Sequence, residues 1–409
     1  MDRSPRGNVR RLAVGRLISV TGSAAAYTAL MFTIWSRTHS AALQSLALFL
    51  TFGATGLLGP LAGALGDRFD RRRVMVISEA VAAAFFAVMA FVHTPGLLIA
   101  LAFGSAVAET PFWAASGAAI PNLVEKDDDI AWANSLLVVG RNAGITVGPV
   151  VGGVLLGVLG ASMVFGINAI SFVLSVLLTL SVHGRFAAER SVRDEEAHRG
   201  IAAGLKFLGR EPVLRRMTIA WVVFLLGAGM GMVADAALAE LFRAGAVGFG
   251  LIITCWGGGS VLGSLAGRWL NREREPVWLV LGAGIIAVGS FGVGVSPVFW
   301  GVLVCALVWG AADGITIVAE QGIMQRRTPH AVRGRVMAGF EAVLSLSIAV
   351  AYVFAAPVLH ALGPQAVYRI GGASAAAAAL VLLPLLRLRR EAIADKAGEE
   401  LTPAPLDLA

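Results

Sequence analysis

Two carboxylates in this chain stand beside a tryptophan at helical spacing, inside long apolar stretches. Trp113 follows Glu109 by four residues and Trp309 precedes Asp313 by four, so each pair lies on one helical face. A carboxylate beside an indole suits a lipophilic cation, which gains Coulomb attraction and cation–π contact together. The same carboxylates could carry a proton, because burial disfavours the charged form and an approaching cation favours it. The two pairs therefore predict a site at which cation and proton compete.

Asp235 and Arg141 are further ionisable residues in apolar stretches, where burial costs at least a few kcal/mol without a partner. We expect Arg141 to balance the charge of Glu109 when that carboxylate is ionised. An inert Glu109–Arg141 pair that locks two helices is the alternative. Instead of forming a cation site, Trp113 and Trp309 could pack against other helices or face lipid. Both readings place these residues at membrane depth.

The composition indicates that lipid is the main solvent of the chain. Hydrophobic residues make up 57% of the 409 residues and charged residues 14%. A membrane-crossing helix needs about 20 apolar residues. The sequence thus predicts an all-α polytopic membrane protein with twelve transmembrane helices, at 10–35, 42–65, 74–93, 97–122, 131–158, 162–182, 214–238, 247–269, 276–295, 298–323, 336–360 and 366–386.

Basic residues alternate between the predicted loops. With the N-terminus in the cytoplasm, all 33 basic residues fall in cytoplasmic segments except Arg37, Arg243 and Arg369 outside and Arg16 and Arg141 within spans. Lysine and arginine are retained on the cytoplasmic side of membranes, so both termini should be cytoplasmic. The net charge of +7 is then explained by basic residues that set the orientation of the chain in the membrane. We therefore expect no nucleic-acid partner.

The chain contains an internal repeat. The segment that begins at Gly63 has a weaker echo at Gly263, and Pro121 and Pro149 correspond to Pro329 and Pro357. The sequence therefore predicts two pseudo-symmetric six-helix bundles. The predicted divisions are an N-terminal bundle at 1–183, a cytoplasmic linker at 184–213, a C-terminal bundle at 214–390 and a disordered cytoplasmic tail at 391–409.

The loop after the second span carries an aspartate among several arginines, and its motif residues are Gly63, Asp67, Arg68, Arg71 and Arg72. A carboxylate at the membrane boundary can accept hydrogen bonds from free N–H groups at the start of a neighbouring helix. The arginines can bridge to carboxylates or lipid phosphates. The loop is predicted to form a breakable cytoplasmic latch, or else only to enforce topology.

The fifth span contains four glycines and a proline, at Gly144, Gly148, Pro149, Gly152 and Gly153. Glycines allow close backbone contact between membrane helices, and the proline removes one helical hydrogen bond. We predict a bending point here, with ordinary tight packing as the alternative.

The loop and the fifth-span pattern resemble signatures of the major facilitator superfamily and, within it, of multidrug-type proton antiporters. The stretches Ala131–Leu136 and Arg333–Val336 also resemble the subgroup of macrolide and siderophore exporters. The resemblance implies that the latch closes the cytoplasmic side against the eleventh span in the outward-facing state. Relatives often carry an acid in the first span, where this chain has Ser23 and Tyr27, and Asp70 stands where a glycine is usual.

These observations together predict a secondary transporter of the inner (plasma) membrane that acts as a monomer. We expect it to export amphiphilic, drug-like molecules, with cations among the candidates, in exchange for protons by rocking its halves about a midplane site. An importer or a lipid or siderophore carrier of the same fold is the alternative, and a receptor or intramembrane enzyme the remote one. The sequence has no His-Glu-x-x-His motif, phosphate-binding glycine loop or catalytic serine signature, so we expect no enzyme, cofactor or metal.

Overall fold

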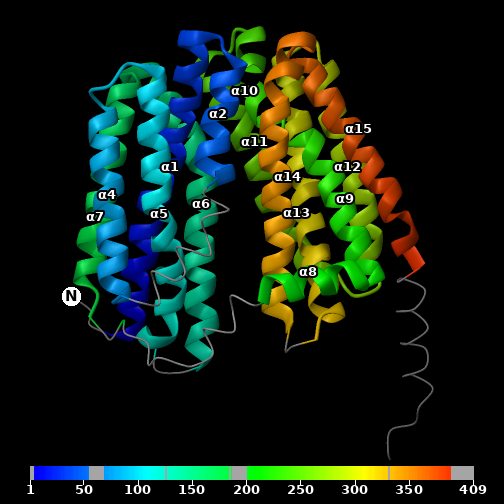
Figure 1. The fold of residues 1–409 in the computed structure, drawn as a ribbon, viewed down its shortest axis with the longest axis horizontal. Helices are drawn as coiled ribbons and strands as arrows, with labels where there is room; N and C mark the ends of the chain where they lie inside the picture. The colour runs from blue at the N-terminus through cyan, green and yellow to red at the C-terminus, as the bar shows by residue number, and fades with distance from the viewer. Residues whose placement is uncertain are drawn as a thin grey trace, which may run out of the picture.

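The structure is a computed structural model that describes residues 4–54, 69–124, 127–183, 186, 200–329 and 332–387. Within these ranges the regular structure is helical throughout, without a strand. The helices stand side by side in two groups, the N-terminal group on the left of Figure 1 and the C-terminal group on the right. The predicted all-α class is confirmed.

The described elements follow the predicted spans closely. The N-terminal group contains α1 (Pro5–Thr38), α2 (Ala41–Leu48), a π-helical segment (Phe49–Ala54), α4 (Arg71–Met89), α5 (Pro95–Leu123), α6 (Asp127–Leu159) and α7 (Ala161–Ser181). The C-terminal group contains α8 (Gly200–Arg210), α9 (Pro212–Ala228), α10 (Gly231–Leu241), α11 (Gly245–Ala266), α12 (Glu275–Val295), α13 (Phe299–Arg327), α14 (Arg333–Leu362) and α15 (Pro364–Leu382), with 3₁₀ turns at Gly267–Trp269 and Leu383–Leu386.

Ten segments in the described ranges are long and apolar enough to cross a membrane. The predicted spans 74–93 and 42–65 complete the twelve. Helix α4 matches the former, and α2 with the π-helical segment covers the start of the latter as far as Ala54. The rest of that span and the predicted tail at 391–409 lie outside the described residues, as does most of the predicted linker before α8.

The seventh span differs from its prediction because it consists of two helices, α9 and α10. The helix is interrupted at Gly229 and Met230, in a glycine-rich stretch of low helix propensity. A Cβ atom at Gly229 would lie 2.9 Å from the Cβ of Ala351, so the absence of a side chain lets this span approach α14. The interruption leaves Asp235 on the short helix α10.

Two glycines reveal the repeat in the backbone itself. Gly160 joins α6 to α7 with φ 81° and ψ 166°, and Gly363 joins α14 to α15 with φ 77° and ψ 169°. This region of backbone space is essentially restricted to glycine. The same connection therefore recurs at corresponding places in the two halves, as the pseudo-symmetry predicts.

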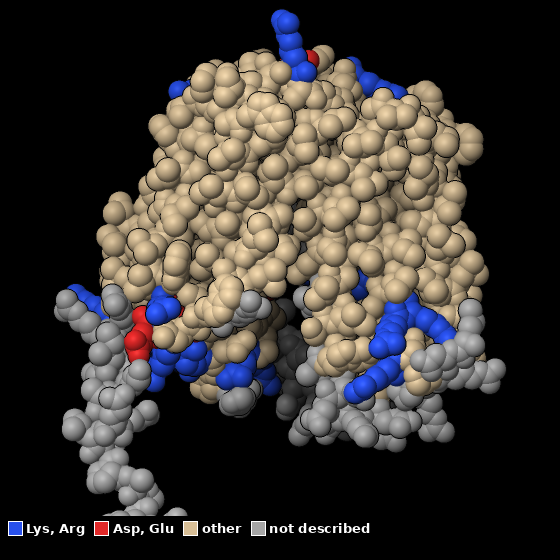
Figure 2. All heavy atoms as spheres, turned by 180° about the vertical axis from the view of Figure 1, so that it is seen from behind, with Lys and Arg blue, Asp and Glu red and all other residues tan. Residues whose placement is uncertain are grey.

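The two ends of the molecule differ in how the halves meet. We call the end that carries α8, at the bottom of Figure 1, the linker end, and the opposite end, where Gly160 and Gly363 lie, the distal end. One apolar core joins both halves, with Leu30 and Phe86 from the first and Phe249 from the second. Two other cores are confined to one half each. The space-filling view shows the halves in contact distally and a hollow between them at the linker end (Figure 2).

Candidate transport site

Helices α6 and α11 form the principal contact between the halves. The Thr254 hydroxyl donates a hydrogen bond of 3.2 Å to the carbonyl oxygen of Thr146. Closer to the distal end, a Cβ at Gly153 would lie 2.6 Å from the carbonyl oxygen of Ala246. These contacts involve the distal half of α6, so the hollow at the linker end lies below them.

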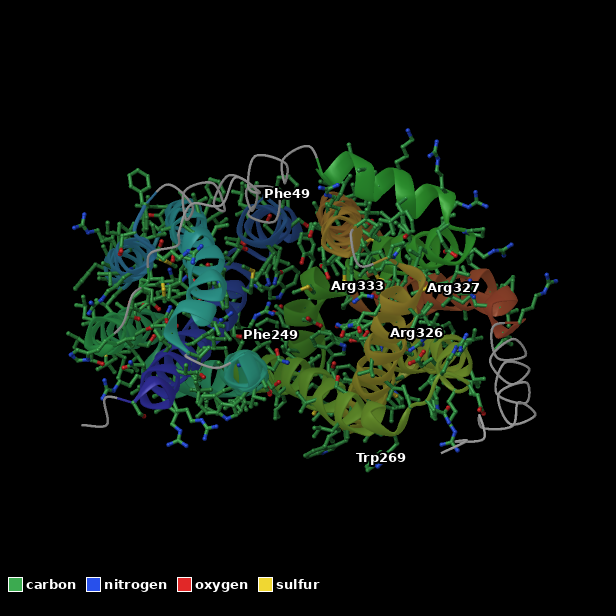
Figure 3. The ribbon with its side chains drawn as sticks, turned by 90° about the horizontal axis from the view of Figure 1, so that it is seen from below. Phe49, Phe249, Trp269, Arg326, Arg327 and Arg333 are labelled. Atoms are coloured by element: carbon green, nitrogen blue, oxygen red, sulfur yellow. The ribbon has the colours of Figure 1, made fainter. Side chains whose placement is uncertain are left out.

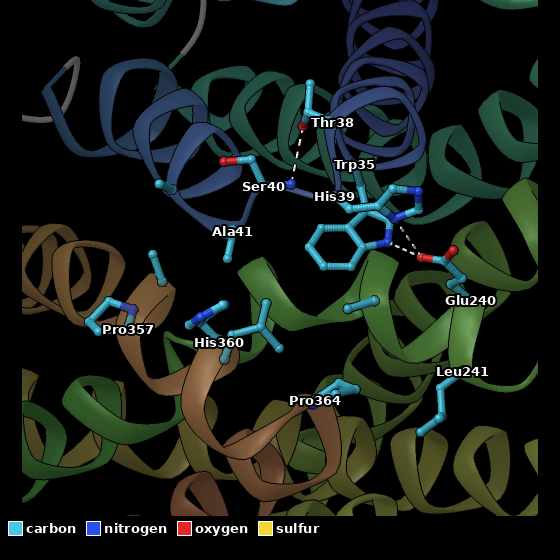
Figure 4. A pocket seen from close by; sticks show the side chains of 14 residues that line it. Trp35, Thr38, His39, Ser40, Ala41, Glu240, Leu241, Pro357, His360 and Pro364 are labelled. Carbon is cyan, nitrogen blue, oxygen red and sulfur yellow. Dashed lines mark hydrogen bonds and ion pairs between the residues drawn. The ribbon is translucent and has the colours of Figure 1, made fainter.

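The distal closure contains a polar cluster at the edge of a pocket of about 870 Å³ between α1, α2, α10 and α14 (Figure 4). The indole N–H of Trp35 donates to the carboxylate of Glu240, and His39 Nδ1 lies 3.4 Å from the same carboxylate. Trp35 and His39 belong to the first half and Glu240 to the second. The cluster therefore ties the halves together at the end away from the hollow.

Glu109 lies at the middle of α5, within a small polar network. The Ser105 hydroxyl donates a hydrogen bond of 3.2 Å to its Oε1 atom, and Tyr27 of α1 lies next to both residues. Towards the linker end, Ser175 donates a hydrogen bond of 2.6 Å to the buried Glu79. The first half thus holds its carboxylates with neutral hydrogen-bond donors.

Arg141 differs from the sequence expectation, because its guanidinium lies over Trp113 and makes no ion pair with Glu109. Its Cζ is 5.4 Å from the ring centroid, and Arg16 of α1 approaches the same ring at 4.4 Å. The cation–π position that the sequence assigned to a ligand beside Trp113 is therefore occupied by the chain's own arginines. Helices α1 and α6 both pack against α5 here, which sequence spacing along one helix cannot reveal.

Asp235 forms the corresponding polar network in the second half. The Tyr368 hydroxyl of α15 donates a hydrogen bond to its Oδ1 atom, and Tyr352 lies nearby with its hydroxyl 3.1 Å from the Met232 sulfur. The Tyr368 ring also packs edge-to-face on Trp309, with centroids 6.3 Å apart. Asp235 and Trp309 thus belong to one cluster through Tyr368.

Asp313 is buried on α13, with 7% of its surface exposed. Within the described part of the chain it has no hydrogen-bond or ion-pair partner. The nearby Trp309 ring packs against Tyr368 and Trp256, and its indole nitrogen is buried without an acceptor. Glu320, two turns further towards the linker end, is 8% exposed. Helix α13 therefore carries two buried carboxylates, and neither forms an ion pair with an arginine of the described residues.

The fifth-span glycines lie in tight helix contacts. Cβ atoms at Gly144 and Gly148 would lie 2.9 Å and 2.5 Å from side-chain atoms of Val20 and Ala24 on α1. Gly152 continues the same face against Ala25, while Gly153 and Pro149 face α11. Helix α6 is continuous through Pro149. The glycines provide close packing on both sides, and the bending role stays a prediction.

Three of the predicted latch residues, Gly63, Asp67 and Arg68, lie outside the described residues. Arg71 begins α4, and Arg72 donates to the carbonyl oxygen of Leu180 in α7, within its own half. Seen from the linker end, the labelled Arg326, Arg327 and Arg333 belong to the opposite half (Figure 3). Arg326 pairs there with Glu275.

Sequence reasoning missed that the tyrosines stand beside carboxylates, and it missed the distal cluster. The chain has only three tyrosines, and each stands beside a carboxylate: Tyr27 near Glu109, and Tyr352 and Tyr368 near Asp235. A hydroxyl inside an apolar span usually needs a partner, so their rarity and placement were a usable signal. In the described ranges no cluster of three or more His, Cys, Asp or Glu side chains could hold a metal ion.

Comparison with known proteins agrees with this architecture. A family model described as "Transmembrane secretion effector" matches residues 10–409. The enterobactin exporters EntS of Shigella boydii serotype 4 (strain Sb227) and Escherichia coli O139:H28 (strain E24377A / ETEC) are each 24% identical over 338 residues, covering 80% of this chain and 79% of theirs. A point mutant of the nucleoside transporter NupG superposes with a TM-score of 0.75 at 14% identity, covering 92% of this chain and 99% of that one. A bacterial homologue of the human lysosomal transporter Spinster, inward-facing and unoccupied, superposes with 0.68 at 13%, covering 99% and 100%.

Proposed function

Because the chain belongs to the transmembrane secretion effector family of the major facilitator superfamily, we propose that it exports amphiphilic small molecules in exchange for protons. It is a membrane transporter and not an enzyme. In the proposed cycle, substrate enters the hollow at the linker end, and the two halves then rock to open the distal end. Asp313, Asp235 and Glu109 are the proposed proton carriers.

The observation that carries this proposal is Asp313, which is buried on α13 without a hydrogen-bond or ion-pair partner in the described ranges. An ionised carboxylate at membrane depth is costly unless it is paired or hydrated. Protonation removes that cost, so the charge state of Asp313 can change between a wet hollow and a closed interior. A residue of this kind supports proton coupling.

The linker end is proposed to face the cytoplasm, with both termini there. Lysine and arginine gather at this end in Figure 2, and only a few mark the distal end. The positive-inside rule favours this orientation. Export is favoured over import because the similar proteins from Shigella and Escherichia are named exporters, and the siderophore enterobactin of their names makes siderophore-like compounds a candidate substrate class.

The test is transport in inverted membrane vesicles with an imposed proton gradient, using panels of anionic, neutral and cationic amphiphiles. We expect gradient-driven uptake by the wild type and its loss in Asp313→Asn. Glu273→Gln, in the loop before α12, is the matched control and should retain the gradient dependence. Uptake by Asp313→Asn with an unchanged pH dependence would overturn the assignment of the coupling proton to this residue.

A further inference from the structure

We propose that Arg16, Trp113 and Arg141 form a binding site for an anionic group on an aromatic ring, so that the exported amphiphiles include aromatic carboxylates and phenolates. This inference rests on the proposed function, since it names a substrate class for the same hollow. It concerns the N-terminal wall of that hollow. We call these three residues the arginine–tryptophan stack.

The geometry of the stack brings two like charges together. The guanidinium carbons of Arg16 and Arg141 lie 4.4 Å and 5.4 Å from the centroid of one indole ring, and they come from different helices, α1 and α6. Arginine does not lose its proton in proteins, so both charges persist. The Trp113 ring offsets part of their mutual repulsion by cation–π attraction.

The stack has no counter-ion in the part of the chain that the structure describes. Neither arginine forms an ion pair there, and the Glu109 carboxylate is hydrogen-bonded by Ser105 instead. Only one long hydrogen bond, 3.5 Å from Arg16 to the Ser116 hydroxyl, uses a guanidinium donor. The Nε atom of Arg16 is buried without any acceptor. Two positive charges with free donors at membrane depth favour an anion as the missing partner.

The stack lies between the linker end and the distal core, which is the depth that a substrate entering from the linker end would reach. Trp113 lies ten residues before the end of α5, about 15 Å along the helix axis from that end. The ring is half-buried at the edge of the apolar core confined to the first half, and the Arg141 side chain is exposed. The distal core shared by the two halves closes the hollow beyond it.

The chemistry of the stack selects a planar anion. A guanidinium can donate two parallel hydrogen bonds to a carboxylate and stacks on an aromatic face. An aromatic carboxylate or phenolate can use both interactions at Arg141, adding a ring to the existing stack while its oxygens take up the free N–H donors. A quaternary ammonium would instead meet two positive charges.

The experiment measures equilibrium binding to the purified full chain in lipid nanodiscs, without a gradient. The probes share one ring and differ in charge: 1-naphthoate, 1-naphthalenemethanol and 1-naphthylmethylammonium. We expect naphthoate to bind at least about tenfold more tightly than the alcohol, as charge-assisted hydrogen bonds imply. Arg141→Gln should weaken naphthoate binding about tenfold and leave the alcohol unchanged, and Arg141→Lys should fall between.

Arg37→Gln is the matched control, because Arg37 is exposed at the distal end, where it donates to the carbonyl oxygen of His93. It should bind naphthoate as the wild type does. Equal affinities of the wild type for the three probes would overturn the inference, as would wild-type naphthoate binding by Arg141→Gln. If Arg16→Gln fails to fold, the exposed Arg141 still decides the question. Naphthoate selectivity without proton-driven flux would refute the coupling proposal alone, and flux without selectivity would refute the stack alone.

Discussion

The two halves share a backbone plan but differ in the charge that they place at membrane depth. Gly160 and Gly363 repeat one connection with nearly identical dihedral angles. Yet the first half carries the arginine–tryptophan stack and a hydrogen-bonded Glu109, whereas the second carries Asp313 alone and Asp235 beside tyrosines. The difference suggests a division of labour in which the repeat supplies the movement and each half supplies a separate binding chemistry.

The largest expected effect distinguishes the carboxylates of the two halves. Asp313→Asn should lower proton-driven export about 100-fold, whereas Glu109→Gln should lower it only about tenfold, because an amide in place of Glu109 can still accept the bond from Ser105. Initial rates in inverted vesicles measure both. Equal losses would mean that the two halves take the same part in proton coupling.

The shared backbone of the two halves predicts that the same substitution at Gly160 and at Gly363 lowers stability equally. Gly160→Ala and Gly363→Ala should destabilise the protein by similar amounts, each about 1–3 kcal/mol, since a Cβ meets open space at both positions and only backbone strain remains. Thermal unfolding in detergent compares the two variants. Gly166→Ala, in helical backbone with open space for a Cβ, should not be destabilised. A strong difference between the two turn variants would contradict structural equivalence.

A smaller effect should follow from the tyrosines of the second half. Tyr368→Phe removes the hydroxyl that donates to Asp235 and should cost about 0.6–1.7 kcal/mol, which spans the mean to the maximum for hydrogen bonds between membrane helices. Tyr352→Phe removes only a contact to the Met232 sulfur and serves as the control. Denaturation midpoints should therefore fall more for Tyr368→Phe. A larger fall for Tyr352→Phe would contradict a stabilising role of the hydrogen bond between Tyr368 and Asp235.

The smallest effect concerns the distal cluster that joins the halves. Glu240→Gln should weaken the contacts to Trp35 and His39 by about 0.2–1 kcal/mol, because these side chains are largely exposed. Spin labels across the distal end should then report up to about a fivefold increase in the open population. Arg37→Gln, which alters a contact inside one half, should leave the distribution unchanged.

The sequence could predict the spans because bilayer thickness fixes the length of an apolar helix. It placed α4, α6 and α13 within a few residues of their observed bounds. It could not predict the partner of Arg141, because that contact depends on how three helices rotate against one another. The interruption at Gly229 was visible only as a glycine-rich stretch, whose effect depends on the approach of α14.

The contacts of Arg16 could not be predicted either, because hydropathy indicates its depth in the membrane but not which helices lie next to it. Its contact with Trp113 follows from the packing of α1 and α6 against each other and against α5. The tyrosines carried a clearer signal. Their scarcity in an apolar chain marked the positions where buried carboxylates would find donors.

The apolar core that spans both halves at the distal end also blocks the passage of water and protons. A cell that stores energy as a proton gradient loses that energy through any continuous column of water across its membrane. With the hollow filled from the linker end, the packed side chains around Leu30, Phe86 and Phe249 are the barrier that keeps water from the other side. In the proposed cycle, the two cores that are each confined to one half would have to join into a second barrier before the distal core parts, so that no water column crosses the membrane.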